Sequence, residues 1–177
     1  MTEAVRAAVK VDVERTELRT FERPQIPPDG ALLRVESAGV GGSDPELYRR
    51  PNHAPIIMGH ENVGTIVEIG PLAAVRWGLK VGDRVALHEY LPCWHCEWCL
   101  QGDQRLCMEV DFFNVKDQFR TLRFGMSDCG IPPHLWGGFA QYMYLPWNSV
   151  IHRIPPDLDA RLATLAIPFG NGWQWAV

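Results

Sequence analysis

The chain has 177 residues, of which 46% are hydrophobic and 21% charged, and its formal net charge is -4. These values are typical of one globular unit with a sizeable core and exclude two large domains. The mild charge, without a Lys/Arg block, argues against nucleic acid as a partner. No apolar run approaches ~18 residues and the first residues lack an apolar h-region, so we expect a cytoplasmic protein without a membrane partner.

Short segments with β-type composition follow one another along most of the chain. They are rich in Val, Ile and aromatic residues, alternate partly between apolar and polar, and end at Gly, Pro or Asp. The segments are 4–11, 31–40, 62–70, 82–90, 139–146 and 149–155. Closely spaced short strands of this kind predict a mainly β domain, either a barrel or a sandwich.

The last part of the chain has a different pattern. After two consecutive prolines, Asp157 can cap a helix on which Leu158, Leu162 and Leu165 share one face. The segment "PFGNGWQWAV" then begins a second apolar helix without a polar tail. Exposed tryptophans at such a position are unusual, so we expect another element to cover this helix.

Four of the five cysteines form one cluster. Cys93, Cys96, Cys99 and Cys107 have the spacing C-x2-C-x2-C-x7-C, which lets four thiolates converge on one ion within a lobe of about residues 91–110. Four protein ligands make a closed, structural zinc site with no open position. The alternatives are two disulfides, free cysteines, or an iron–sulfur cluster, although the Cys-Pro that usually follows after three residues is absent. Cys129 is predicted to be an ordinary small side chain.

Five segments occur in an order that resembles a known family. They are "GVGGSDPELY", "IIMGHENVGTIVEIG", "VGDRVAL", the four-cysteine lobe and "GGFAQYMYLP". This set resembles the N-terminal, GroES-like domain of the zinc-containing medium-chain alcohol dehydrogenase/reductase superfamily. The resemblance implies a partly open, strongly bent β-barrel with short helices (mainly β, α+β) over residues 1–156. It also implies that 157–177 begins a helical crossover to a Rossmann domain. No G-x-G-x-x-G occurs, so we expect that domain to be absent from this chain.

The resemblance also assigns a catalytic zinc site. In zinc-dependent members, a cysteine, the histidine of the G-H-E motif and a third residue near the crossover bind the ion. The matching positions hold Gly41, His60 and approximately Ile167. Glycine and isoleucine offer no ligand, so we expect the structural zinc to be kept and the catalytic zinc site to be lost.

Other members of the predicted site are retained. Asp44 matches the aspartate that orients the zinc histidine, Ser43 matches the hydroxyl that relays a proton, and Glu61 matches the glutamate beside the histidine. The predicted catalytic set is therefore Ser43, Asp44, His60 and Glu61. The alternative is that His60 is a hydrogen-bonded, partly buried histidine with the two carboxylates as structural partners. The sequence leaves open whether His88 and Glu89 face the site or solvent.

The function implied is hydride transfer between a nicotinamide and a carbonyl, alcohol or activated C=C bond of a small-molecule substrate. NAD or NADP would bind only if a Rossmann domain were supplied, by a missing domain or a partner chain. We therefore expect the chain to be inactive alone and to form homo-oligomers. The alternative from another class is a noncatalytic, zinc-stapled subunit or pseudo-enzyme module.

Overall fold

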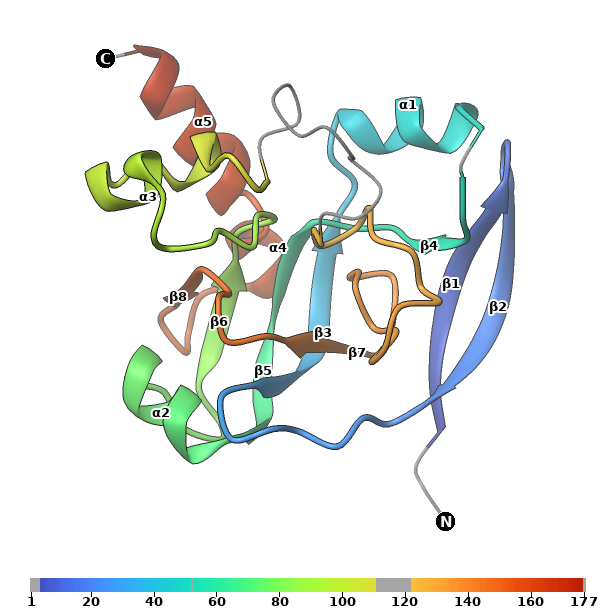
Figure 1. The fold of residues 1–177 in the computed structure, drawn as a ribbon. Coiled ribbons are helices and arrows are strands. Elements are labelled where there is room, and N and C mark those ends of the chain that lie inside the picture. Colours follow the sequence, from blue (N-terminus) through green and yellow to red (C-terminus); the bar gives the residue numbers. More distant parts are fainter. Residues whose placement is uncertain (1–3, 52, 111–121, 177) are drawn as a thin grey trace.

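Strands dominate the computed structural model, which describes residues 4–51, 53–110 and 122–176 (Figure 1). A three-stranded sheet has the order β2-β1-β4 and a five-stranded sheet the order β7-β3-β5-β6-β8. The first comprises β1 (Ala4–Asp12), β2 (Arg15–Glu22) and β4 (Ile56–Ile57). The second comprises β3 (Ala31–Gly39), β5 (Glu61–Ile69), β6 (Arg84–Leu87), β7 (Tyr142–Leu145) and β8 (Ile151–Arg153). Each of these ladders is antiparallel.

The two sheets are joined just before β7. Ala7 of β1 forms a bridge with Ala140, and the N–H of Ala8 donates to the carbonyl of Phe139 over 2.8 Å. This pairing bends the sheets around a shared interior. In the described chain β2 and β8 each pair with one strand only, so the barrel stays partly open. The predicted mainly β, GroES-like fold with a lobe and short helices is confirmed. The sequence reading missed β2, whose mostly exposed side chains show little apolar alternation.

The core has two main clusters, and β3 contributes to both. Leu32 packs with Val5 and Ile57, whereas Leu33 packs with Ile66 in the cluster under the five-stranded sheet. Neighbouring strand residues point to opposite faces, so one strand supplies both clusters. β3 therefore lies between the two core clusters and contributes side chains to each.

The helices are short and lie at the rim of the sheets (Figure 1). They are α1 (Ser43–Arg49), α2 (Pro71–Trp77), α3 (Glu97–Gln101), the 3-10 turn η1 (Gln104–Leu106), α4 (Ala160–Ala163) and α5 (Ala166–Ala176). The predicted cap Asp157 is wrong. A turn in which Leu158 N–H donates to the Pro155 carbonyl delays the helix, and Asp159 caps it by accepting the Arg161 N–H over 2.8 Å.

The last helix presents a large apolar surface. Phe169, Trp173 and Trp175 of α5 are 71%, 74% and 82% exposed, and no residue of the helix is buried. Among the helices of the described residues, none has the length and apolarity needed to cross a membrane.

Candidate functional site

The four predicted cysteines come together in the lobe around α3 and η1. Their sulfur atoms lie within 4.8 Å of one another, and all are free of disulfides. Backbone N–H groups support them: those of Cys96 and Cys93 lie 3.3 Å from the sulfurs of Cys93 and Cys107. This donor set fits the closed, tetrahedral zinc site predicted from the spacing.

The environment of these thiols is suited to a cation. N–H groups of Cys99 and Met108 lower the pKa of Cys96 to about 6. Burial, together with neighbouring thiols, raises the pKa of Cys99 to about 12. Four sulfurs this close together cannot all ionise without a positive charge among them, and a bound metal would supply it. A second possible group, Cys93 with His95 and Glu109, shares one sulfur with the first and is largely exposed.

The second predicted site lies where β3 and β6 end and β5 begins. Gly59, with φ at +89°, turns the chain so that His60 enters directly before β5. Strands β5 and β6 pair with the register Val63↔Ala86. If the same antiparallel register continues three residues past this pair, from Val63 back to His60 and from Ala86 on to Glu89, then Glu89 lies opposite His60. The Nε2 atom of His60 lies 3.9 Å from Oε2 of Glu89.

Asp44 closes the loop that precedes α1. Its Oδ2 accepts the N–H of Gly41 over 2.8 Å, and its own N–H donates to the Gly41 carbonyl over 3.1 Å. Its Oδ1 lies 3.5 Å from Nδ1 of His60. That separation is long for a hydrogen bond, and Oδ1 has no hydrogen-bond partner within the described chain, so we treat the contact as electrostatic. Two hydrogen bonds between Asp44 and Gly41 therefore hold this turn.

Three carboxylates surround one imidazole in this site. Burial lowers the pKa of His60, but Asp44, Glu89 and Glu61 outweigh it and raise that pKa above its ordinary value. Burial also raises the pKa of Glu61, which His60 opposes and the other two carboxylates reinforce. The site therefore favours a protonated ring and can offer protons at a buried position.

The catalytic zinc ligand set implied by the resemblance does not fit. A Cβ at Gly41 would lie 2.9 Å from Nε2 of His60 and 3.0 Å from Oε1 of Glu61, so a side chain there would have to displace both groups. Ile167 instead lines a pocket of about 250 Å³ with Leu87 and His88, between α5 and β6. Of the three expected ligand positions, only His60 carries a ligand atom.

The predicted catalytic residues are only partly brought together. Asp44, His60 and Glu61 are all buried and interact, whereas Ser43 is exposed at the start of α1. Glu89 belongs to the site but was left undecided by the sequence. The signal that could have found it is strand register, because His60 and Glu89 continue the pairing of β5 with β6.

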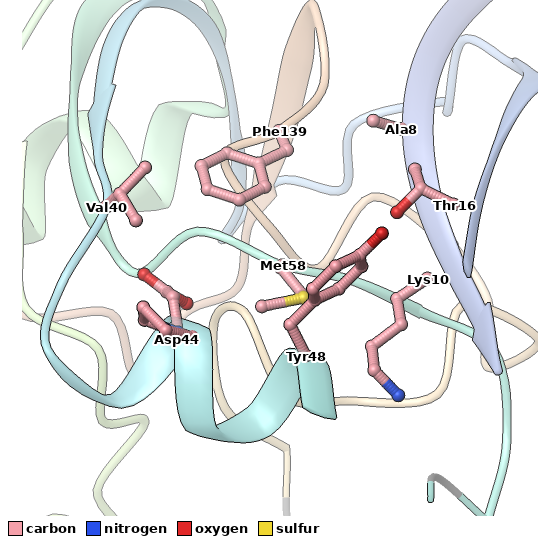
Figure 2. Close-up of a pocket in the computed structure, with 9 residues that line it drawn as sticks. Ala8, Lys10, Thr16, Val40, Asp44, Tyr48, Met58 and Phe139 are labelled. Atoms are coloured by element: carbon pink, nitrogen blue, oxygen red, sulfur yellow. The ribbon is translucent and has the colours of Figure 1, made fainter. Parts of the chain in front are cut away.

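A separate pocket of about 280 Å³ lies between α1 and β1, and its lining includes Val40, Asp44 and Tyr48 together with Lys10 and Thr16 (Figure 2). Lys10 is buried and donates from Nζ to the carbonyl of Arg50 over 2.9 Å, next to the end of α1. Of the predicted catalytic residues, Asp44 alone lines this pocket. The pocket is therefore not the centre of the candidate site.

Comparisons with known proteins agree with this fold. Residues 27–156 match the family described as "Alcohol dehydrogenase GroES-like domain". The chain is 38% identical to the "Probable alcohol dehydrogenase adh" of Mycobacterium tuberculosis over 175 residues, which cover 98% of this chain and 46% of that protein. It therefore spans about half the length of that curated relative.

Solved structures show the same architecture. An alcohol dehydrogenase from Thermotoga maritima superposes with a TM-score of 0.73 at 25% identity, covering 93% of this chain and 44% of that chain. A protein described as a short chain alcohol dehydrogenase from Escherichia coli, solved with NADH, gives 0.70 at 25% identity and covers 94% and 43%. Both structures contain a large part with no counterpart in these 177 residues.

Proposed function

This chain belongs to the alcohol dehydrogenase GroES-like domain family, and from that membership we propose that it is the catalytic-domain portion of an NAD(P)-dependent medium-chain oxidoreductase. Residues 1–156 form the catalytic domain and 157–177 begin the crossover to a dinucleotide-binding domain. The observation that carries the proposal is the preserved Asp44–His60–Glu61 group beside a loop that keeps its shape without a metal ligand.

Zinc has one role in this proposal. Cys93, Cys96, Cys99 and Cys107 would hold a structural ion, which fixes the lobe beside β6 and β8. The catalytic zinc of the family is lost, because Gly41 and Ile167 supply no ligand. The substrate oxygen is therefore not polarised by a thiolate-bound ion here.

The chemistry is hydride transfer between a nicotinamide and a small molecule. A carbonyl, an alcohol or an activated C=C bond is the reacting group, and the loss of two ligand residues favours the activated alkene. The accompanying proton comes from Ser43 or from an acid beside it. The raised pKa of Glu61, caused first by burial, keeps a proton available in the site.

A dinucleotide domain must be supplied for turnover. The sequence has no Gly-rich turn to hold a pyrophosphate at a helix N-terminus. Without it, the nicotinamide is not positioned and the advantage of proximity is lost. The apolar residues of α5 (Phe169, Trp173 and Trp175) are suited to contact with that domain, in the same chain or in a partner, and with a second copy in a homo-oligomer.

The test is a chimaera. The second half of the M. tuberculosis relative is joined after residue 177, and the absorbance of NADH and NADPH is followed with carbonyls, alcohols and activated alkenes. The free chain should neither bind nor oxidise the cofactor, and the chimaera should oxidise it. A matched chimaera with His60→Ala should bind the cofactor but turn over slowly.

The noncatalytic, zinc-stapled module remains the second candidate, favoured by the missing ligand at Gly41. A folded chimaera that binds NADH but reduces no substrate class would support the module and contradict the proposed enzyme. Cofactor binding by the free chain would contradict the need for a second domain.

A further inference from the structure

Glu89 is the carboxylate of the site that the sequence left unassigned, and it faces the Nε2 atom of His60. Asp44 faces Nδ1 at 3.5 Å and Glu89 faces Nε2 at 3.9 Å. The two carboxylates come from α1 and from the segment after β6, on opposite sides of the ring. Nε2 is the atom by which this histidine would hold a metal if Asp44 held Nδ1–H.

The loop backbone at Gly41 and the Glu61 carboxylate also lie near Nε2. Glycine at position 41 lets the ring and the Glu61 carboxylate approach the loop backbone, since a Cβ there would lie only 2.9 Å from Nε2. The charged side chains that face the ring are Asp44 from α1, Glu61 from β5 and Glu89 after β6. A neutral ring would set a lone pair against one carboxylate, Glu89 if the proton is on Nδ1 and Asp44 if it is on Nε2, and either arrangement is electrostatically unfavourable.

We propose that Glu89, which faces Nε2 of His60, keeps this atom a hydrogen-bond donor, so that His60 serves the reaction as a proton donor and not as a metal ligand. Glu89 is thus a positioning residue that acts through His60. The inference rests on the proposed oxidoreductase function and deepens it, because it names the proton source.

The distances leave room for a substrate atom. A gap of 3.9 Å exceeds a hydrogen bond, so the Nε2–H is not held by Glu89 and is available to donate to an entering oxygen. The side chains of His60 and Glu89 are 11% and 22% exposed. The outer edge of the pair therefore reaches solvent while the Asp44 side, at 3% exposure, does not.

For a carbonyl substrate, His60 would donate its proton as the nicotinamide transfers its hydride. The hydride of a reduced nicotinamide forms the new C–H bond at the carbonyl carbon, and the π electron pair of C=O moves to oxygen. That oxygen takes the proton from Nε2, whose N–H electron pair stays on the ring and leaves it neutral. Water on the Glu89 side returns the proton. In the oxidation of an alcohol the same steps run backwards.

The experiment follows the His60 ring by long-range ¹H–¹⁵N NMR in the full chain with its structural zinc, from about pH 5 to about pH 9. The signal is identified by its absence in His60→Gln. The pKa of wild-type His60 is raised, so the ring should keep protons on both nitrogens above pH 6.5, the ordinary pKa of histidine. Glu89→Gln should move deprotonation to lower pH, and Glu89→Asp should restore part of the shift. Glu109→Gln, at a carboxylate beside His95, should leave His60 unchanged.

Three results would overturn the proposal. The first is the observation, in the wild-type protein, that the His60 ring has lost its Nε2 proton at neutral pH. The second is a titration that Glu89→Gln leaves unchanged in a protein that still holds its zinc. The third is a second zinc per chain that His60→Gln removes. None of these measurements requires a cofactor domain, so an inactive chimaera would count against the proposed enzyme without deciding the state of His60.

Discussion

Replacing Cys107 by serine tests whether a metal holds the lobe. Cys107 is fully buried and its sulfur lies 3.3 Å from the N–H of Cys93, so the change removes one ligand and weakens one backbone contact. We expect the zinc content to fall from one per chain to none. Residues 91–110 should then lose their order while the two sheets remain folded.

The expected loss of order in the lobe is large because the lobe buries few apolar side chains besides its cysteines. Its cluster consists of three cysteines and Val110, and one buried valine contributes about 1.5–3 kcal/mol. Ordering a single residue costs about 1–2 kcal/mol of backbone entropy, so apolar burial cannot hold this lobe. A structural zinc contributes about 10–16 kcal/mol in peptides and can do so.

Hydrogen exchange measures the loss. The N–H groups of Gly102 and Val110, which donate to carbonyls of Cys99 and Cys107, should lose at least about a thousandfold protection, or about 4 kcal/mol. The N–H of Ile66 in the sheet should change little. The matched control is Cys129→Ser, a buried cysteine outside the lobe, which should keep its zinc. Unchanged zinc content and protection in Cys107→Ser would refute the metal-held lobe.

Three further outcomes are expected. Gly41→Ala should lower the free energy of unfolding by about 1–3 kcal/mol in chemical denaturation, because its Cβ would meet His60 and Glu61 at 3.0 Å or less. The control is Gly42→Ala, whose Cβ would have open space around it. Equal losses of stability in the two variants would contradict the reasoning. The raised pKa of His60 means that the stabilisation from its charged ring is fully present below 6.5, the ordinary pKa of histidine, and is lost as pH rises through the folded pKa. His60→Gln should therefore cost more at about pH 5 than at about pH 9, and a cost independent of pH would be inconsistent with a charged ring. Removal of residues 157–177 should lower self-association in sedimentation experiments, because it deletes the exposed aromatic residues of α5; a strictly monomeric parent would count against that role.

The sequence predicted the strands that carry strong apolar patterns and the cysteine spacing that forms the lobe. It failed where backbone pairing or a turn, and not an apolar pattern, decides the structure. Arg15–Glu22 became a strand because β1 offers a partner along eight pairs of residues, although its own side chains are mostly exposed. Asp159 replaced Asp157 as the cap because a turn at Pro155 shifts the helix start.

The candidate site shows the same division. Asp44, His60 and Glu61 could be predicted because they stand in short motifs that resemble a family. Ser43 was predicted with them, but it is exposed at the beginning of α1 and stays a prediction as a proton relay. Glu89 could not be assigned because its direction depends on how β6 pairs with β5, and pairing register is a property of the folded sheet.

The pairing of β5 with β6 also determines where the chain can change length. The segment between the two strands includes α2, whose Leu72 and Val75 are exposed, so added residues there would extend a surface connection and leave the ladder intact. An added residue between Ala86 and Glu89 would be different. Side chains alternate in direction along a strand, so a single insertion would turn the Glu89 carboxylate to the opposite face and put His88 further from its present pockets. Natural or engineered variants with loop insertions should therefore keep the chemistry of His60 only when the insertion falls on the α2 side.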